Sequence, residues 1–347
     1  MIVRAENKNP GEPVVAAEAG NGRVRAILID YQRPVVWRSL TQLAISLALF
    51  LAFEVALYAT FGISYWLTLA LAVPAAAMVV KLFIIQHDCG HGAFMPSARG
   101  NDLIGHLCSL ATFTPYLHWR RQHAGHHAVW NDLDRRDSGV DLYSVCITLD
   151  EYQALSPWGR RRYRLMQHPL LALVLLPPLI FLVVYRFAFD TPASWWRERR
   201  SVHLTNAALL LLYGGLGLVF GFGTVAAVQL PVIAMAALVG VWLFSSQHRF
   251  EHVVWRRHAD WDATTAALRG SSFLKLPRFF DWVTGHIGFH HIHHLSARVP
   301  NYRLRAAHEA LAPVTELAPP LGFLRSLGAS RFAVWDEANG RMIRFPH

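Results

Sequence analysis

The amino-acid sequence predicts an all-α membrane protein with four transmembrane helices in two hairpins, a re-entrant or interfacial segment, and a cytoplasmic helical cap rich in histidine. Three observations predict this fold. Of the 347 residues, 53% are hydrophobic and only 16% are charged, which is too apolar for an ordinary soluble protein. Four apolar runs are each long enough to cross a bilayer. Histidines gather beside the ends of these runs.

The N-terminal segment, residues 1–38, is polar and contains Pro10 and Pro13. We expect a cytoplasmic tail that ends in a short interfacial helix. The first apolar run begins near residue 40, which is too late, and is too long, for a cleaved signal peptide.

The first hairpin is expected over residues 39–86 and the second over residues 204–247. Crossing a bilayer core takes roughly 20 apolar residues of helix. The predicted spans are Leu43–Gly62 and Trp66–Ile85, joined by a GISY turn, and Asn206–Gly223 and Val225–Ser245, joined at GFGT.

A fifth apolar run, Leu170–Phe189, lies in the segment 170–203 and is broken by Pro177-Pro178. Arginines cluster on both sides of it, whereas the turns inside the two hairpins carry no Lys or Arg. The positive-inside rule therefore places both flanks on the cytoplasmic side, so the run is predicted to be re-entrant or interfacial. Its non-helical backbone must then be covered by protein.

The remaining charged and polar features fit the same membrane arrangement. The formal charge of +10 comes from arginines in loops beside apolar runs, which indicates membrane topology and no nucleic-acid partner. The apolar stretch Asn101–Tyr116 predicts a helix lying at the interface. Glu54 lies within a span and is expected to face protein or to be protonated, since Lys81 lies at a different depth. Three cysteines without disulfide spacing predict reduced thiols, and they are Cys89, Cys108 and Cys146.

The histidine groups lie in two regions that are predicted to be cytoplasmic, residues 87–169 and 248–347. Spacings of i, i+4 and of i, i+3, i+4 place imidazoles on one helical face. The first group is HDCGH, the second is HAGHH, the third closes the last span in QHRFEH, and the fourth is HHIHH. Their histidines are His87 and His91; His123, His126 and His127; His248 and His252; and His290, His293 and His294, with His286 and His291 beside the last three.

These rings predict a dimetal site. Imidazole is a good ligand for zinc, copper, iron or nickel, and each ring donates one nitrogen. Eight or nine converging rings would overfill one ion, but they suit two ions with open positions. Ligand rings usually donate their other N–H to a carboxylate or carbonyl. Plausible carboxylate partners are Asp88, Asp102, Asp132, Asp134 and Asp137, among which we favour Asp88 and Asp134.

The stretches HDCGHGAF, HAGHH and HHIHHLSARVPNYRL resemble the three histidine boxes of the integral-membrane fatty acid desaturases, in the bacterial acyl-lipid Δ12/ω-6 or ω-3 branch. The similarity runs from about Tyr31 to about His308. The HxxxH spacing of the first box agrees with this branch. The sequence departs from the family pattern at His252, where we would expect another residue, and at His286, where we would expect asparagine.

The resemblance implies two iron ions and O₂ as co-substrate, with two electrons from an outside donor, to form a cis double bond in an unactivated acyl chain. Its substrate would be a membrane glycerolipid, and its location the bacterial inner membrane, with both termini and all boxes cytoplasmic. No HPGG haem signature follows His168-Pro169, so we expect a separate ferredoxin or cytochrome as electron donor. The cytoplasmic arginines are candidates for docking this partner or for contacting anionic lipid.

The three boxes supply eight ligands, and a ninth is expected from the end of the last span. We favour His248 because it lies one turn nearer the membrane and because the family resemblance places a histidine there. His252 and His286 stay open as alternatives, and both are otherwise expected, like His291, to be hydrogen-bonded neighbours of ligand rings.

Three other functions stay open. A related membrane di-iron hydroxylase or carotenoid ketolase would use the same ligands. A histidine-rich metal transporter would place its ligands near the bilayer midplane, whereas these boxes lie at or beyond span ends. A bis-histidine haem protein would need only two or four of these rings.

Overall fold

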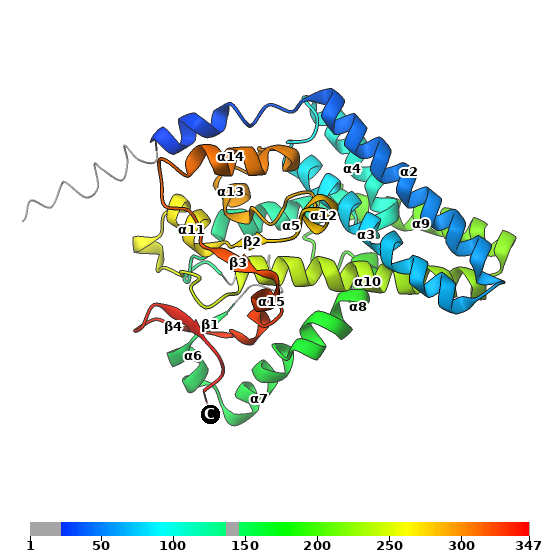
Figure 1. The fold of residues 1–347 in the computed structure, drawn as a ribbon. Coiled ribbons are helices and arrows are strands. Elements are labelled where there is room, and N and C mark those ends of the chain that lie inside the picture. Colours follow the sequence, from blue (N-terminus) through cyan, green and yellow to red (C-terminus); the bar gives the residue numbers. More distant parts are fainter. Residues whose placement is uncertain (1–21, 137–145, 347) are drawn as a thin grey trace, which may run out of the picture.

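The computed structural model describes residues 22–136 and 146–346, and within them four helices are long and apolar enough to span a membrane. These helices are α2 (Val36–Phe61), α3 (Tyr65–Gly90), α9 (Trp196–Phe220) and α10 (Phe222–His248). They form the two predicted hairpins, and the chain is mostly helical (Figure 1). The predicted fold class, a helical membrane protein with four spans, is confirmed.

The two hairpin turns have clear local causes. Ser64 caps α3, because its side chain accepts a hydrogen bond from the Leu67 amide. Gly221 separates α9 from α10 with a φ of +86°, a conformation that glycine adopts without steric cost. The turn is tight, since a side chain on Gly217 would collide with the ring of Phe222.

Two spans extend further than their apolar runs. Helix α3 continues to Gly90 and α10 continues to His248, so both carry histidines at their ends. In α3 the added turn is buried, with His87 4% exposed and Asp88 2% exposed. Hydropathy ends the prediction where the residues become polar, but the helix continues because protein covers that turn.

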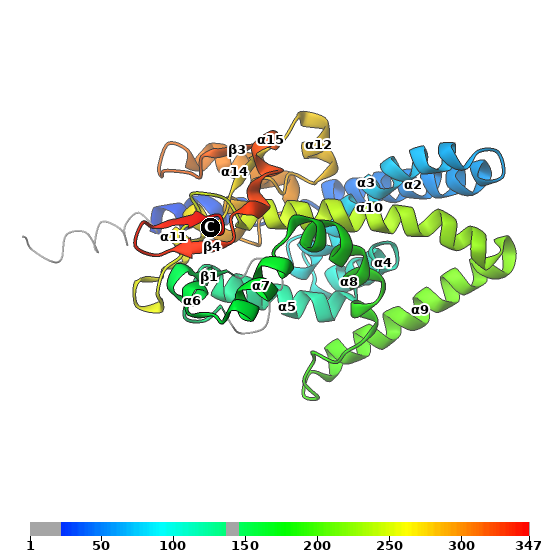
Figure 2. The same ribbon diagram turned by 90° about the horizontal axis from the view of Figure 1, so that it is seen from below.

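The membrane helices pack unevenly around α3 and α10. One apolar cluster joins Leu57 of α2, Ala76 and Val79 of α3, and Val232 of α10. By contrast, α9 diverges from α10 beyond their shared turn, so the two form an open V (Figure 2). Glu54 faces protein, which is one of the two expectations given above, and it accepts a hydrogen bond from Gln229 of α10.

The Pro-Pro segment lies beside α10. It consists of a π-helix (Leu170–Leu175), α8 (Leu176–Leu182) and a 3₁₀ turn (Val184–Arg186), and together they bend by 44° from α7 (Pro157–Met166). Each proline lacks an N–H, and its ring crowds the carbonyl four residues earlier. The preceding turn is widened into π form, in which the Leu176 amide bonds to the carbonyl of Leu171.

Reporter fusions test whether this bent segment crosses the membrane. Fusions made after Pro169 and after Trp195 should both report a cytoplasmic location, because arginines flank the segment on both sides. A fusion in the uncharged turn near Gly62 is the control, and it should report the opposite side. Opposite readings at Pro169 and Trp195 would make the segment a fifth span.

Outside the spans, short elements form a cap over the ends of α3 and α10. Residues 22–29 are helical, which matches the helix expected at the end of the tail, while the tail up to residue 21 lies outside the described residues. Helix α4 (Ala98–Thr112) exposes Leu103 and Leu107, in keeping with an interfacial position. The other helices are α5 (Tyr116–Val129), α6 (Leu149–Ala154), α11 (Ala263–Gly270), α12 (Arg278–Val283), α13 (His290–Leu295), α14 (Leu304–Leu311) and α15 (Phe323–Ser326), with 3₁₀ turns His258–Asp260, Asn301–Arg303 and Ala329–Arg331.

Residues 22–136 and 146–346 also contain five short strands, which the helical prediction did not include. Strand β4 (Val334–Asp336) pairs in parallel with β1 (Ile147–Thr148) and antiparallel with β5 (Arg341–Ile343), and β2 (Phe273–Lys275) pairs in parallel with β3 (Pro320–Gly322). Arg249, directly after α10, is buried and donates hydrogen bonds to the carbonyls of Ser330 and Phe332 and to the side chain of Gln167. The C-terminal strands are thereby fixed to the end of the last span. The three cysteines are free and buried, as expected for reduced thiols.

Candidate metal centre

Nine histidines from four helices meet where the spans end and the cap begins. His87 lies in the last turn of α3 and His91 caps that helix, while His248 ends α10. Helix α5 supplies three rings and the short helix α13 supplies three more. Segments more than 150 residues apart in the sequence therefore present their imidazoles to one another, for example His127 and His293, whose Nε2 atoms are 3.0 Å apart.

The rings divide into two groups whose nitrogens could each hold a metal ion. Within each group, one ring nitrogen of every member lies within 4.8 Å of the others. The first group is His87, His91, His123, His127 and His293, and the second is His126, His248 and His294.

Helix geometry explains this division. Successive residues of an α-helix point about 100° apart, so two neighbouring histidines face different directions. In α5, His127 joins the first group and His126 the second, and in α13, His293 joins the first and His294 the second. The doublets His126-His127 and His293-His294 therefore each give one ring to each group.

The second group is closed by α10. His248 is fully buried, and its Nε2 lies 3.1 Å from Nε2 of His126 and 3.0 Å from Nε2 of His290. His290 is thus adjacent to the second group, although it lies outside the set of nitrogens within 4.8 Å of one another. Trp119, one turn before His123, stacks on the ring of His123 with centroids 4.6 Å apart and so fixes its orientation.

The electrostatics of the cluster fit a bound cation. Burial lowers the pKa of the cap histidines well below the usual value, and neighbouring rings lower it further. The affected rings are His123, His127, His290, His293 and His294. Neutral imidazole has a free lone pair, and none of the described residues forms a hydrogen bond to the buried Nε2 of His91 or His294. Converging neutral imidazole nitrogens are the donor set that a transition metal requires.

Two of the predicted supporting residues lie next to these rings. Oδ1 of Asp88 is 3.5 Å from Nδ1 of His87, and its Oδ2 accepts hydrogen bonds from the backbone and side chain of Asn301. His291 follows His290 directly, but its Nε2 pairs with Nδ1 of His308 at 2.9 Å rather than with a ring of the cluster.

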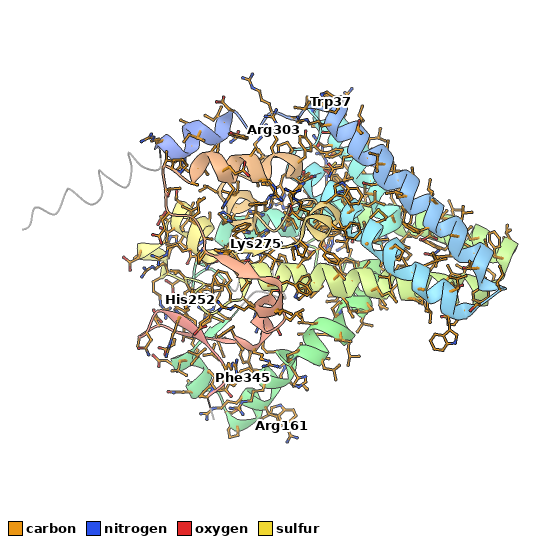
Figure 3. All side chains as sticks on the ribbon, viewed as in Figure 1. Trp37, Arg161, His252, Lys275, Arg303 and Phe345 are labelled. Carbon is orange, nitrogen blue, oxygen red and sulfur yellow. The ribbon has the colours of Figure 1, made fainter. Side chains whose placement is uncertain are left out.

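The structure does not bring the other predicted partners to the cluster. Asp134 binds Arg257 and the backbone amide of His258, and His286 binds Asp281. His252 is exposed in the turn after α10 (Figure 3). Two further carboxylates are engaged elsewhere, Asp102 by Arg120 and Asp132 by His258, and Asp137 lies outside the described residues.

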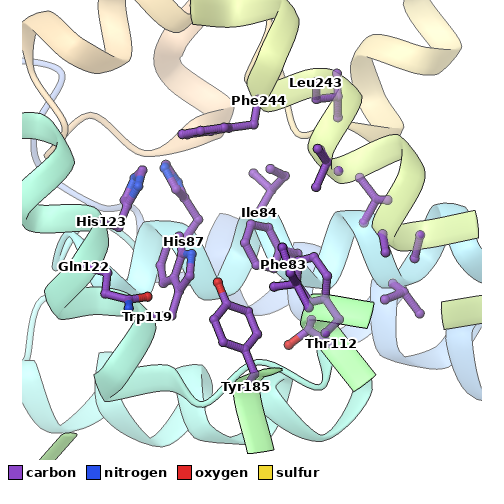
Figure 4. A pocket seen from close by; sticks show the side chains of 18 of the residues that line it. Phe83, Ile84, His87, Thr112, Trp119, Gln122, His123, Tyr185, Leu243 and Phe244 are labelled. Atoms are coloured by element: carbon purple, nitrogen blue, oxygen red, sulfur yellow. The ribbon is translucent and has the colours of Figure 1, made fainter. Parts of the chain in front are cut away.

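An apolar cavity of about 280 Å³ leads from the histidines into the membrane region. Its walls come from α3, α5, α8 and α10, and His87 and His123 lie at one end of it (Figure 4). Residues from Ile233 to Gln247 of α10 line it, a stretch that covers about 21 Å of helix. Its small side chains on α10, Ala236, Ala237 and Gly240, leave the cavity open.

Part of the cavity wall is polar, which no motif in the sequence predicted. Asp190 accepts a hydrogen bond from Gln122 at 2.6 Å and lies 3.1 Å from Nε2 of His118. Tyr185 projects into the same cavity with its hydroxyl toward the middle (Figure 4). Asp190, Gln122 and Tyr185 belong to no recognisable sequence motif. Trp119 could have been identified from the sequence, because it lies four residues before His123 on the same helix and therefore on the same face.

Comparisons with known proteins agree with this geometry. A family model described as fatty acid desaturase matches residues 64–322, about three quarters of the chain. The chain is 38% identical to a fatty acid desaturase of Bacillus subtilis over 315 residues, which cover 91% of this chain and 88% of that protein.

More distant relatives are acyl-lipid desaturases. An sn-1 oleoyl-lipid 12-desaturase of Synechocystis is 28% identical over 66% of this chain and 64% of its own length. An sn-1 acyl-lipid omega-3 desaturase (ferredoxin) of the same organism is 29% identical over 67% of this chain and 64% of its own length. With four membrane-spanning helices, two histidine groups and this match over most of its length, the chain is a membrane enzyme that belongs to the fatty acid desaturase family.

Proposed function

We propose that this desaturase uses two iron ions and O₂ to insert a cis double bond, with Δ12 selectivity, into an acyl chain of a membrane glycerolipid. The observation that carries the proposal is the position of the two histidine groups at the end of an apolar cavity between the spans. Such a cavity gives an acyl chain access from lipid to the histidines.

The ligands in this proposal are nine rings. The eight box histidines are His87, His91, His123, His126, His127, His290, His293 and His294, and the ninth is His248. When bound by these rings, iron would supply the O₂ activation needed to break an aliphatic C–H bond, which no amino-acid side chain can supply. Asp88 accepts a hydrogen bond from Nδ1–H of His87 and so orients that ring, while Asn301 donates a hydrogen bond to the Asp88 carboxylate.

The remaining residues of the cavity position the substrate and exclude water. Phe83, Trp119 and Phe244 surround the end of the cavity next to His87 and His123 (Figure 4). An apolar wall of this kind holds an acyl chain in place and keeps bulk water from the reacting carbon.

The partners in this proposal are a glycerolipid substrate and a ferredoxin or cytochrome that delivers electrons. Relatives named as ferredoxin-linked acyl-lipid desaturases support both. We place the protein in a bacterial inner membrane, with its termini and histidine boxes cytoplasmic. We also propose six regions along the chain. These are a tail, a first hairpin, a loop with two histidine boxes, a re-entrant segment, a second hairpin and a C-terminal region with the third box.

Product analysis tests this function. Expression in a host without polyunsaturated lipids should yield a new cis double bond at Δ12 of monounsaturated C16 or C18 chains, because the boxes resemble the Δ12/ω-6 branch. Fatty-acid profiling with double-bond location measures this. A double bond at the ω-3 position would contradict the proposed Δ12 selectivity. A hydroxylated product or a ketone without a new alkene would show that the protein is a hydroxylase or a ketolase.

A further inference from the structure

A second cavity, of about 220 Å³, lies on another side of α3. It is enclosed by the beginning of α2, the middle of α3, the end of α12 and the turn Asn301–Arg303. None of the residues that line it also lines the cavity next to the histidines. It is therefore a separate site, and the proposed binding of an acyl chain in the apolar cavity next to the histidines does not account for it.

A buried cation forms part of its wall. Lys81 is only 2% exposed, yet no carboxylate oxygen of the described residues lies within 4.0 Å of its Nζ. Its Nζ donates to the backbone carbonyl of Trp282 and lies 4.2 Å from the centroid of that indole ring. Oδ2 of the neighbouring Asp281 is engaged by His286 and Arg305.

This arrangement leaves the ammonium group incompletely paired. An ammonium has three N–H donors, and a buried charge is costly unless it is paired and hydrogen-bonded. One carbonyl and one indole face satisfy it only in part. Lys81 lines the cavity, so an anion held there would supply the missing partner.

The rest of the wall also suits an oxygen-rich anion. Arg38 lines the cavity and is exposed, and among the described residues it forms no ion pair with a carboxylate. Gln42 and Tyr302 also line it, with the Gln42 amide hydrogen-bonded to Asn301 and the Tyr302 hydroxyl hydrogen-bonded to the Val35 amide. Two cations on the wall of one cavity form a typical environment for a phosphate.

Exposed aromatic residues at the rim of the cavity indicate that the anion is a lipid headgroup. Trp37 is 65% exposed and Trp282 is 37% exposed, and both line the opening. Phe279 and Phe280, on the same short helix as Trp282, are 65% and 54% exposed. Tryptophan concentrates at the boundary between lipid and water, so these rings place the opening at the depth of the lipid headgroups.

We infer that this cavity binds the phosphate of an anionic membrane phospholipid, with Lys81 and Arg38 contacting the phosphate oxygens and the exposed aromatic residues contacting the lipid chains. The site is distinct from the channel for the acyl chain that reacts. It also lies close to the histidines, because Asn301 in its wall donates two hydrogen bonds, of 2.7 and 2.8 Å, to the carboxylate of Asp88 beside His87.

Native mass spectrometry of the full-length protein, titrated in detergent with phosphatidylglycerol or phosphatidylcholine, tests the inference. The wild type should bind phosphatidylglycerol more tightly than zwitterionic phosphatidylcholine. Lys81→Met, which keeps the side-chain length, and Arg38→Gln at an exposed position should each weaken phosphatidylglycerol binding about tenfold, as expected for the loss of a charged hydrogen bond. Lys275→Met is the matched control, since Lys275 is an exposed lysine outside this cavity, and it should bind like the wild type (Figure 3).

Thermal unfolding provides a second measurement, because a ligand that binds the folded state raises the melting temperature. Phosphatidylglycerol should raise it in the wild type and in Lys275→Met, and less in Arg38→Gln. Equal binding of the two lipids, wild-type affinity in both Lys81→Met and Arg38→Gln, or equal weakening in Lys275→Met would overturn the inference. Displacement of the lipid by an equal concentration of inorganic phosphate would overturn the identification of the ligand as a lipid.

Discussion

Replacing His248 with alanine is expected to abolish desaturation and to lower the bound metal, whereas His252→Ala leaves most of both. His248 is fully buried at the end of α10, and its Nε2 lies 3.0 to 3.1 Å from those of His126 and His290. His252, one turn of sequence further on, is exposed. Groups that only hydrogen-bond to metal ligands contribute 10- to 100-fold to metal affinity or activity, so the loss of a ligand should exceed about 100-fold.

Metal analysis and turnover of the purified variants measure this difference. His252→Ala is the matched control, because it removes the same side chain from the same stretch of the chain. Far-UV circular dichroism of both variants checks that the helices are retained. A full metal content in His248→Ala would limit the site to the eight box histidines, and a loss confined to His252→Ala would assign the ninth position to that residue.

The spans and the histidine boxes could be predicted because both depend on local sequence patterns. Twenty apolar residues are enough to identify a span, and spacings of three and four residues are enough to place rings near one another on a helix. The continuation of α3 through His87 to Gly90 is predicted by the i, i+4 spacing of the first histidine group and is confirmed, although hydropathy alone would end the helix earlier. It depends on burial of that turn by segments distant in the sequence, such as Asn301, which binds Asp88.

The division of the rings into two groups shows the same limit. Spacing places His123, His126 and His127 near one face of α5, but it does not say which ring joins which group. That depends on α10 and α13 approaching from different sides. His126 meets His248, while His127 meets His293.

Partners of ligand rings were the least predictable part of the site. Asp88 lies beside its ring because it follows His87 in sequence, but Asp134 is held by Arg257 through a contact 123 residues away. The polar wall of the cavity shows the same difficulty, because Gln122 and Asp190 meet only after α5 packs beside the start of α9.

Replacing Gly240 with leucine is expected to lower turnover on C18 chains by at least about tenfold, with bound metal unchanged. Gly240 lies on the wall of the apolar cavity, about 12 Å along α10 from His248. A Cβ added at Gly240 would meet no atom within 4 Å, so this position leaves room for a larger side chain to start into the cavity. The added carbons occupy space that the acyl chain needs, while the histidines stay in place.

Gly215→Leu is the matched control for this experiment. Gly215 is also a helical glycine with open space around it, but it is exposed on α9 and does not line the cavity. Turnover of C14, C16 and C18 substrates by both variants, together with their metal content, separates a narrowed channel from a damaged protein. Gly240→Leu should lose more activity as the chain lengthens, because a longer chain needs more of the cavity. Equal turnover of C18 chains by Gly240→Leu and the wild type would show that the acyl chain does not pass this part of α10.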